Sequence, residues 1–214
     1  TFAYLNFEAP RSVQKAVIDA AEATEKPTLL ILEAPTGIGK TEAALFIADK
    51  WLQKEKGRGL YIAMPTQATS NQIFRRTLNF LKNRYPEEKI NIQLAHGQAQ
   101  WNEDAKSLRP TAMGEGANDI EKKLRAESWF LPSKKTLLAP FGVGTVDQAL
   151  MGALQTRHFY LRLFGLANKV VIFDEVHAYD TYMGKLFLRL LSWLRAIGTS
   201  VIVLSATLPE ETRR

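Results

Sequence analysis

The chain has 214 residues, a net charge of +6 at pH 7, 46% hydrophobic residues and 23% charged residues, which is typical of a soluble globular protein with one core. The absence of cysteine excludes disulfides, thiolate zinc sites and cysteine nucleophiles. No apolar run reaches membrane-spanning length and no export signal opens the chain, so we expect a cytoplasmic protein with no membrane partner.

The first segment with helical spacing of apolar residues is Arg11–Ile18. It contains Gln14, whose amide can donate to and accept from an adenine edge at the same time. Gln14 could equally be a solvated helix residue, and only its position upstream of the next motif favours a nucleotide contact.

A short apolar strand, Leu29–Leu32, runs into a glycine-containing loop and then into an alanine-rich helix that reaches Ala48. We call this loop the phosphate loop; its residues are Ala34, Pro35, Thr36, Gly37, Ile38, Gly39, Lys40 and Thr41. Glycine lets backbone N–H groups approach a polyphosphate, and the N-terminus of the following helix favours negative charge. Lys40 can reach the β and γ oxygens, and the Thr41 hydroxyl can bind Mg²⁺.

The pattern therefore predicts a nucleoside triphosphate site, although Ala34 stands where the usual motif has glycine. The alternative is a strand-to-helix turn that carries a Lys-Thr pair by coincidence.

A basic turn precedes a second strand, Leu60–Met64, which ends in Pro65, Thr66 and Gln67. Small hydroxyl and amide side chains at such a junction favour capping of the next helix, and they also suit contact with a phosphate backbone. A helix should follow, and then a third strand at Ile90–Ala95.

The periodic pattern weakens over residues 96–135, so we expect an insertion with a partly mobile stretch near 111–117 and a helix at Asp119–Trp129. Trp101 and Trp129 could stack on bases, but buried packing is the more common use of tryptophan.

Strand character resumes at Thr136–Phe141 and leads to another strand-to-helix junction, where Thr145 should cap the helix that contains Asp147. The next strand, Lys169–Phe173, shows no alternation of apolar and polar residues, so it should be buried on both faces of a parallel sheet. An amphipathic helix with an apolar stripe from Met183 to Ile197 should cover that sheet.

A last strand, Val201–Leu204, ends in Ser205, Ala206 and Thr207. The alternation of strands and helices predicts an α/β fold with a mostly parallel central sheet flanked by helices. In such folds the loops at the carboxyl ends of the strands form the site.

Asp174 and Glu175 form an acidic pair directly after the strand that should be buried. Phosphoryl transfer to water needs one group that holds Mg²⁺ and another that positions the attacking water. We assign the metal to Asp174, through a water, and the attacking water to Glu175.

The histidines have less specific signals. His177 could relay the state of the phosphates to Ser205 or Thr207, or it could simply bond a nearby carbonyl. His96 and His158 have no spacing typical of a metal site, so we regard them as structural residues.

In chain order, the motifs are Gln14, the phosphate loop, Pro-Thr-Gln, Gly-Thr-Val-Asp-Gln, Asp-Glu-Val-His and Ser-Ala-Thr. Over nearly the whole chain this set resembles the first RecA-like domain of superfamily 2 DEAD/DEAH-type helicases, which are P-loop NTPases. Three segments together look most like the CRISPR-associated helicase-nuclease family of type I (Cascade) systems: Gly144–Gln148, Asp-Glu-Val-His-Ala-Tyr-Asp at 174–180, and Leu204–Pro209.

The resemblance implies ATP and Mg²⁺ as cofactors, with adenine recognition at Gln14, Mg²⁺ at Thr41 and Asp174, and hydrolysis at Glu175. It also implies coupling through Ser205 and Thr207. The residues that it assigns to contact with single-stranded DNA are Pro65, Thr66, Gln67, Thr145 and Asp147.

The same resemblance leads us to expect one RecA-like ATP-binding domain over residues 1–214 of a larger protein. The partners would be a second RecA-like domain, a metal-dependent nuclease domain and the Cascade complex. Without the arginine finger of the second domain, which is worth roughly 10³ to 10⁵ in rate, turnover should be slow. The alternatives are an RNA helicase of the same superfamily, and a P-loop kinase or nucleotide switch with no role in nucleic-acid binding.

Overall fold

The computed structural model describes residues 15–16, 18–19, 28–55, 57–86, 90–95, 124–125, 135–154, 156–176 and 179–207. The four described residues before position 20 are helical, as the apolar spacing predicts. Predictions for several other residues lie outside the described part of the chain: Gln14, His96, Trp101, Trp129, His177 and the stretch near 111–117.

Strands and helices alternate along the chain. Their order is β1 (Leu29–Glu33), α2 (Lys40–Glu55), β2 (Leu60–Met64), α3 (Gln67–Arg84), β3 (Ile90–Ala95), β4 (Leu124–Arg125), the 3-10 helix η4 (Thr136–Leu138), β5 (Phe141–Thr145), α5 (Val146–Leu150), α6 (Phe159–Leu166), β6 (Val170–Phe173), α7 (Thr181–Ala196) and β7 (Ser200–Ser205). Among the helices of the described residues, none has the length and apolar character needed to cross a bilayer.

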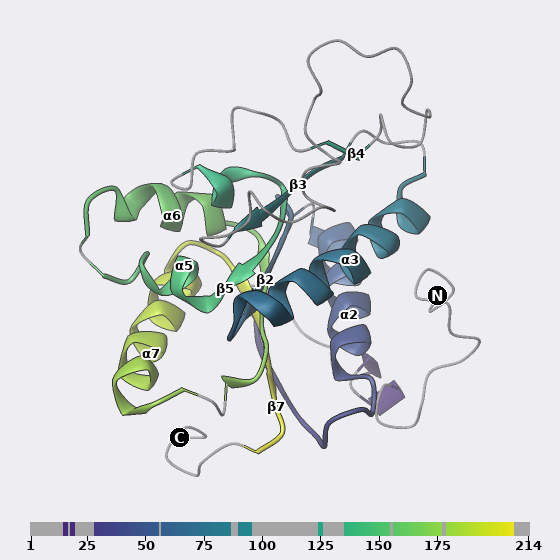
Figure 1. Ribbon diagram of the computed structural model, residues 1–214, viewed down its shortest axis with the longest axis horizontal. Coiled ribbons are helices and arrows are strands. Elements are labelled where there is room, and N and C mark those ends of the chain that lie inside the picture. The colour runs from purple at the N-terminus through teal and green to yellow at the C-terminus, as the bar shows by residue number, and fades with distance from the viewer. Residues whose placement is uncertain are drawn as a thin grey trace.

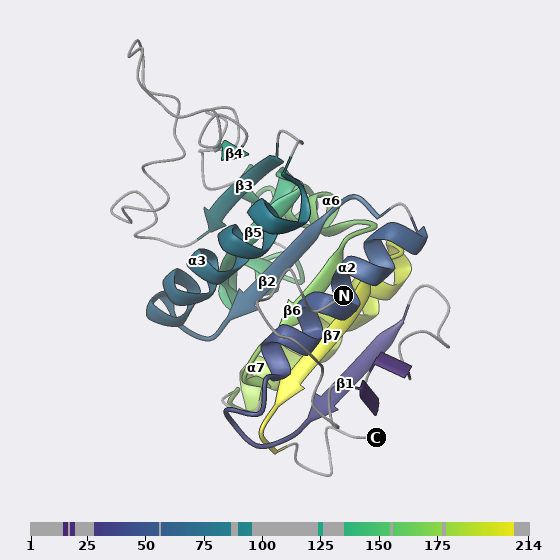
Figure 2. The ribbon, with the colours of Figure 1, turned by 90° about the vertical axis from the view of Figure 1, so that its right-hand side faces the viewer.

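The strands form one sheet in the order β1-β7-β6-β2-β5-β3-β4 (Figure 2), and every described strand pair is parallel. This confirms the predicted α/β class with a parallel central sheet. Because the strands run in the same direction, their carboxyl ends meet at one edge, so the segments that follow β1, β2, β5, β6 and β7 lie along that edge.

Helices cover both faces of the sheet: α2 and α3 lie on one face, and α5, α6 and α7 on the other (Figure 1). Alternate strand residues supply the two cores. Ile62 and Ile172 pack in the cluster that contains α2 and α3 side chains, and Tyr61 and Phe173 pack in the cluster that contains α5 to α7 side chains. Each large apolar side chain buried in this way contributes about 1.5–3 kcal/mol, before the entropy of ordering it is subtracted.

Helix α7 confirms the predicted amphipathic stripe. Phe187, Leu190 and Leu194 are buried under the sheet, and the ring of Phe187 meets that of Phe173 edge to face at 4.9 Å between centroids. The helix begins where the Asp180 side chain accepts a hydrogen bond from the Met183 N–H at 2.7 Å, which satisfies one of the unpaired donors at a helix start.

The predicted strand at Thr136–Phe141 is wrong, because Thr136–Leu138 form the 3-10 turn η4 and the strand is Phe141–Thr145. The two glycines in β5 weaken its strand signal, but the packing requires Gly144. A Cβ on Gly144 would lie 2.2 Å from the Ala95 carbonyl oxygen and 2.7 Å from the Tyr61 hydroxyl.

Lys169 holds the η4 turn in place from the start of β6. Its ammonium donates hydrogen bonds to the carbonyls of Leu137, at 2.8 Å, and Ala139, and its side chain is 3% exposed. Burial, with a smaller effect from the charge of Arg58, lowers the pKa of Lys169 to about 7.

The helix predicted at Asp119–Trp129 is wrong for the two residues of that range that the structure describes. Leu124 and Arg125 form β4 and pair in parallel with Ile90 and Asn91 of β3. An edge strand such as β3 offers a row of unpaired backbone groups, and pairing satisfies them whatever the local helix propensity of the partner.

Candidate nucleotide site and nucleic-acid junctions

The phosphate loop lies between β1 and α2, as predicted. Its glycines adopt left-handed conformations, with φ of 81° at Gly37 and 90° at Gly39, which residues with a Cβ rarely adopt. Helix α2 starts at Lys40, so the unpaired N–H groups of its first turn face the end of the loop. This is the arrangement that binds an anion at a helix N-terminus.

The Lys40 ammonium is held by its own loop. It donates hydrogen bonds to the carbonyl of Ala34 and, at 3.1 Å, to that of Pro35. A triphosphate would offer this cation charged oxygens in place of neutral carbonyls, and charge-assisted hydrogen bonds are about twice as strong as neutral ones.

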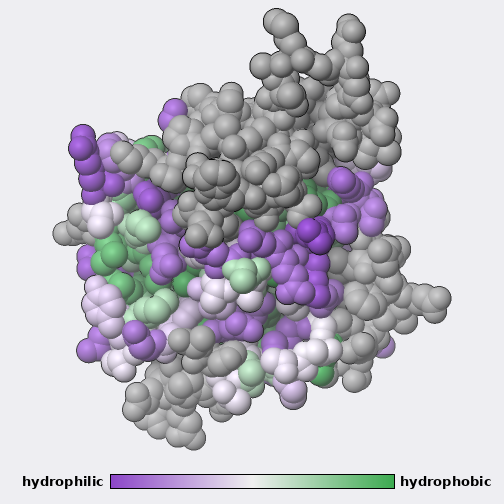
Figure 3. Space-filling view, viewed as in Figure 1, coloured by the Kyte–Doolittle hydropathy of each residue, from purple (hydrophilic) through white to green (hydrophobic). Residues whose placement is uncertain are grey.

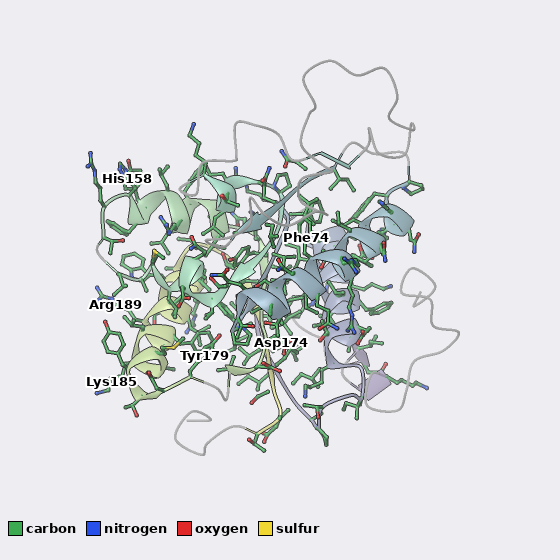
Figure 4. All side chains as sticks on the ribbon, viewed as in Figure 1. Phe74, His158, Asp174, Tyr179, Lys185 and Arg189 are labelled. Atoms are coloured by element: carbon green, nitrogen blue, oxygen red, sulfur yellow. The ribbon has the colours of Figure 1, made fainter. Side chains whose placement is uncertain are left out.

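The loop meets the acidic pair through Thr41. The Thr41 hydroxyl lies 3.4 Å from a carboxylate oxygen of Asp174, although the two residues are 133 positions apart in the sequence. The second carboxylate oxygen of Asp174 accepts a hydrogen bond from the Glu175 N–H at 2.9 Å. The predicted meeting of the phosphate loop with the end of the buried strand is therefore present, at the position of the Asp174 label in Figure 4.

Asp174 is 8% exposed, and burial raises the pKa of its carboxyl above the ordinary value. The hydrogen bond from the Glu175 backbone acts in the opposite direction, as do the charge of Lys40 and the Thr41 hydroxyl. A buried carboxylate whose desolvation is not fully offset is a good ligand for a cation.

The donor set suits Mg²⁺. A hydroxyl and a carboxylate are hard oxygen ligands, and Mg²⁺ sites in proteins generally use one or two such groups together with water and substrate phosphates. Within the described ranges, no three His, Cys, Asp or Glu side chains gather as an all-protein metal cage.

Glu175 has a strained backbone, with φ of 54°, a value that few residues other than glycine adopt outside special sites. Its side chain is half-buried. Strain of this kind at a strand end is common where a side chain is positioned for function.

The end of β7 lies beside the phosphate loop. The Ala34 N–H donates to the Ser205 carbonyl at 3.1 Å, continuing the β1–β7 pairing past the end of β1. The Ser205 hydroxyl donates to the Thr207 carbonyl at 2.7 Å, which fixes the turn after the strand. Two of the three predicted coupling residues are thus next to the nucleotide site.

Thr66 confirms the capping prediction for the first nucleic-acid junction. It is the N-cap of α3, its hydroxyl accepts from the Thr69 N–H at 3.2 Å, and the Thr69 hydroxyl in turn bonds the Thr66 backbone. Gln67, the first residue of α3, is exposed, and Pro65 is half-buried.

Thr145 corrects the prediction for the second junction. It is the N-cap residue of α5, but its side chain makes no capping hydrogen bond, so the expected cap is wrong. Instead its carbonyl accepts a hydrogen bond from the buried Tyr61 hydroxyl at 3.1 Å. Asp147, in the first turn of α5, is exposed.

The strand register brings these junctions together. Met64 at the end of β2 pairs with Thr145 at the end of β5, and Ala63 pairs with Phe173, the residue before Asp174. The predicted DNA-contact segments are therefore neighbours of one another and of the acidic pair. His158 lies well away from them at the N-cap of α6, as its label in Figure 4 shows.

Sequence analysis missed two tyrosines at this edge, Tyr61 and Tyr179. Tyr61 is the one residue with a polar group in the apolar strand Leu60–Met64. A tyrosine in such a strand predicts a buried hydroxyl that bonds a specific partner. Tyr179 lies within the Asp-Glu-Val-His-Ala-Tyr-Asp sequence.

A parallel sheet whose first strand feeds a glycine loop, with a threonine of that loop against an aspartate at the end of a central strand, defines a P-loop nucleotide-binding domain. The DEAD/DEAH box helicase family model matches residues 11–214. The chain belongs to this family, and it is an ATP-binding domain of a RecA-like helicase motor.

The relatives are considerably longer proteins. The chain is 46% identical over 207 residues to the CRISPR-associated endonuclease/helicase Cas3 of Thermus thermophilus, covering 96% of this chain and 22% of that protein. The structure is similar to the crystal structure of T. fusca Cas3-AMPPNP, with a TM-score of 0.86, 36% identity, and coverage of 100% of this chain and 23% of that one. It is also similar to a chain of a CRISPR RNA-guided surveillance complex, pre-nicking, with a TM-score of 0.64, 34% identity, and coverage of 95% and 19%.

Proposed function

We propose that this domain is the ATP-driven motor of a Cas3-type helicase-nuclease that moves along single-stranded DNA, unwinding target DNA and feeding it to a nuclease. The observation that carries the proposal is the 3.4 Å contact between Thr41 of the phosphate loop and Asp174 of the acidic pair. This contact joins the phosphate loop to the acidic pair, the two parts of an ATP site that this domain would supply, and the proposed nucleic-acid junctions lie on the adjacent strands.

In this proposal, Mg²⁺ is held by the Thr41 hydroxyl and the Asp174 carboxylate together with the phosphates. Bound there, the metal would neutralise charge that builds up on the transferred phosphoryl group. Lys40 leaves the carbonyls of Ala34 and Pro35 to bind phosphate oxygens, and Gln14 recognises the adenine.

Hydrolysis is assigned to Glu175. Its half-buried carboxylate follows Asp174 directly, and its left-handed backbone sets its side chain apart from the regular strand. It would orient the attacking water and accept a proton from it. His177, Ser205 and Thr207 would transmit the presence of the γ-phosphate to the nucleic-acid side.

Contact with single-stranded DNA is assigned to Pro65, Thr66, Gln67, Thr145 and Asp147. Helix α3, which follows the first junction, supports this assignment because its charged residues are Arg75, Arg76, Lys82 and Arg84, with no Asp or Glu. Arg76 and Arg84 also pair with Glu42 and Asp49 of α2. Figure 3 shows hydrophilic residues over α3. A positive helix favours a phosphate backbone.

The proposed partners are a second RecA-like domain, a metal-dependent nuclease domain and the Cascade surveillance complex, with cytoplasmic action. The chain spans about a fifth of the Cas3 relatives it matches, which leaves room for the first two. The similarity to a chain of an RNA-guided surveillance complex supports the third.

The test compares ATP hydrolysis by the protein that carries this domain in the presence of oligo(dT) and of oligo(U). We expect strong stimulation by oligo(dT). Stronger stimulation by RNA would make the protein an RNA helicase, and no response to either polymer would favour a kinase or nucleotide switch.

Glu175→Gln separates a hydrolytic motor from a nucleotide switch. The variant should keep its affinity for ATP and lose hydrolysis by roughly 10² to 10⁴-fold, the usual contribution of a positioned general base. An unchanged hydrolysis rate would contradict the role of Glu175, and equal loss of binding would make it a structural residue.

A further inference from the structure

A buried hydroxyl lies at the edge between the nucleotide site and the nucleic-acid junctions, and the described residues offer it no hydrogen-bond partner. It belongs to Tyr179, in the segment that joins the acidic pair to α7. Its oxygen is shielded from solvent and has no hydrogen-bond partner within the part of the chain that the structure describes. Such groups are unfavourable and uncommon, so each one calls for an explanation.

The ring of Tyr179 is held by other contacts. Its centroid lies 5.4 Å from that of Phe187 in an edge-to-face arrangement, and Phe187 meets Phe173 in the same way. The Tyr179 N–H donates to the Val176 carbonyl at 3.1 Å. Aromatic packing and the backbone therefore place the ring, and a phenylalanine could satisfy the same contacts.

The hydroxyl faces charges from both sites. Burial raises the pKa of the Tyr179 phenol, and the negative charges of Asp174 and Asp147 raise it further. Asp174 is the metal ligand of the proposed nucleotide site, and Asp147 is assigned to DNA. Tyr179 is thus within electrostatic reach of one carboxylate from each site, and Figure 4 shows it near Asp174.

A second tyrosine continues the path toward the DNA side. Tyr61 is fully buried in β2, and its hydroxyl donates to the Thr145 carbonyl. Burial and the charge of Asp147 raise the pKa of the Tyr61 phenol. Tyr61 belongs to the core cluster that contains Phe173 and Phe187, and Tyr179 packs against the same cluster. This cluster joins Tyr179 to Tyr61, whose hydroxyl reaches the Thr145 carbonyl.

We propose that Tyr179 is a positioning residue that couples the nucleotide site to the nucleic-acid junction, by donating its hydroxyl hydrogen to Asp174 when nucleotide is bound. This inference rests on the proposed function. In the present structure the Thr41 hydroxyl lies against Asp174. When a nucleotide binds, Thr41 is needed at the metal, and Tyr179 replaces the hydrogen bond that Asp174 loses. The small shift of the Tyr179 ring reaches Tyr61 and the Thr145 backbone.

Coupling of two sites is reciprocal, so it can be measured by binding alone. The experiment measures the Kd of the protein that carries this domain for a fluorescent oligo(dT), with and without Mg²⁺ and a non-hydrolysable ATP analogue. The variant is Tyr179→Phe, which removes only the hydroxyl. The matched control is Tyr182→Phe, on the exposed side of α7, where the tyrosine is 66% exposed.

The wild-type protein and Tyr182→Phe should show the same nucleotide-dependent change in Kd, several-fold in size. In Tyr179→Phe the two Kd values should agree to within about two-fold, and the affinity for the ATP analogue should fall several-fold, because the hydrogen bond to Asp174 forms only in the nucleotide-bound state. Without nucleotide, the Tm of Tyr179→Phe should equal or exceed that of the wild type, because the variant buries one unpaired polar group fewer.

Full coupling in Tyr179→Phe would overturn the role of this residue while leaving the proposed motor function intact. A Tm below that of the wild type would also overturn it, because the hydroxyl would then be contributing to the fold. If the wild-type protein itself binds oligo(dT) equally with and without nucleotide, or fails to bind it, the proposed function fails and this inference fails with it.

Discussion

The nucleotide side and the nucleic-acid side of the sheet edge are built in different ways. On the nucleotide side, the key contacts join motifs that are far apart in the sequence: Thr41 with Asp174, and Ala34 with Ser205. On the nucleic-acid side, the side chains of the first junction bond within their own motif, as Thr66 does with Thr69. Thr145 makes no capping hydrogen bond with its side chain, and its carbonyl accepts from the Tyr61 hydroxyl.

This difference indicates which groups on each side would have to change their contacts when a ligand binds. On the proposed nucleotide side, the Thr41 hydroxyl and the Asp174 carboxylate are already neighbours, and nucleotide binding would draw Lys40 away from its carbonyl partners. On the proposed nucleic-acid side, the two segments are placed in register by the backbone pairing of Met64 with Thr145. Under the proposed function, a strand of DNA would contact both segments.

The largest effect should come from removing the cation of the nucleotide side. Lys40→Ala should weaken nucleotide binding by about 100-fold or more, since charge-assisted hydrogen bonds to phosphate are lost. The fold should be retained, because in the absence of nucleotide Lys40 bonds only neutral carbonyls. Titration with a fluorescent nucleotide measures the effect. Lys54→Ala, an exposed site in the last turn of α2, is the control and should bind normally.

The next largest effect is on stability and concerns β5, the strand that ends at Thr145. Gly144→Ala should lower the free energy of unfolding by about 1–3 kcal/mol or more, because the new Cβ would overlap the Ala95 carbonyl and the Tyr61 hydroxyl. Gly184→Ala is the matched control. Its Cβ would meet nothing within 4 Å, and alanine in the first turns of α7 should add about 0.5–1 kcal/mol. Urea unfolding measures both, and equal values for the two variants would refute the packing argument.

A smaller loss is expected at the first junction. Thr66→Ala should cost about 1 kcal/mol of stability by removing the cap of α3. Thr66→Ser keeps the hydroxyl and should restore that stability. If the threonine also contacts DNA through its hydroxyl, the serine variant should bind oligo(dT) as the wild type does, and the alanine variant more weakly. Stability loss in both variants would mean that the methyl group, and not the cap, stabilises the junction.

The smallest effect is a pH dependence on the nucleotide side. Burial raises the pKa of Asp174 above its ordinary value of 3.8, so ionisation of this group destabilises the nucleotide-free fold. The stability that Asp174 contributes is fully present below pH 3.8 and is lost as pH rises through the raised pKa. Asp174→Asn should therefore have a higher Tm than the wild type at neutral pH, and the difference should shrink as the pH is lowered. A constant difference across pH would contradict this origin.

Much of this arrangement could be predicted from the sequence, because it follows from strand order and motif chemistry. The phosphate loop, the buried β6 and the amphipathic α7 have strong local patterns, and parallel strands bring their carboxyl ends to one edge. These patterns together predict that Thr41 and Asp174 meet. No sequence pattern predicts that the Lys40 ammonium bonds carbonyls of its own loop.

The errors arose where tertiary contacts overrule local preference. Glycines are unusual inside a strand, so the two glycines of β5 argued against a strand there. In the fold, position 144 lies so close to Ala95 and Tyr61 that only a residue without a Cβ fits. The sequence pattern around Leu124 and Arg125 predicts a helix, but these two residues pair with the edge of β3. Tyr179 was missed because the signal of its hydroxyl is the absence of a partner, which only a folded chain can show.

Chemical labelling of the buried amine of Lys169 can measure local opening of the structure around the η4 turn. It lies under the η4 turn, where its amine bonds two carbonyls, is shielded from reagents and has a pKa lowered by burial to about 7. Acylating reagents should therefore leave it unmodified while the exposed lysines react. The rate at which Lys169 acquires label would then measure how often the η4 turn separates from the start of β6.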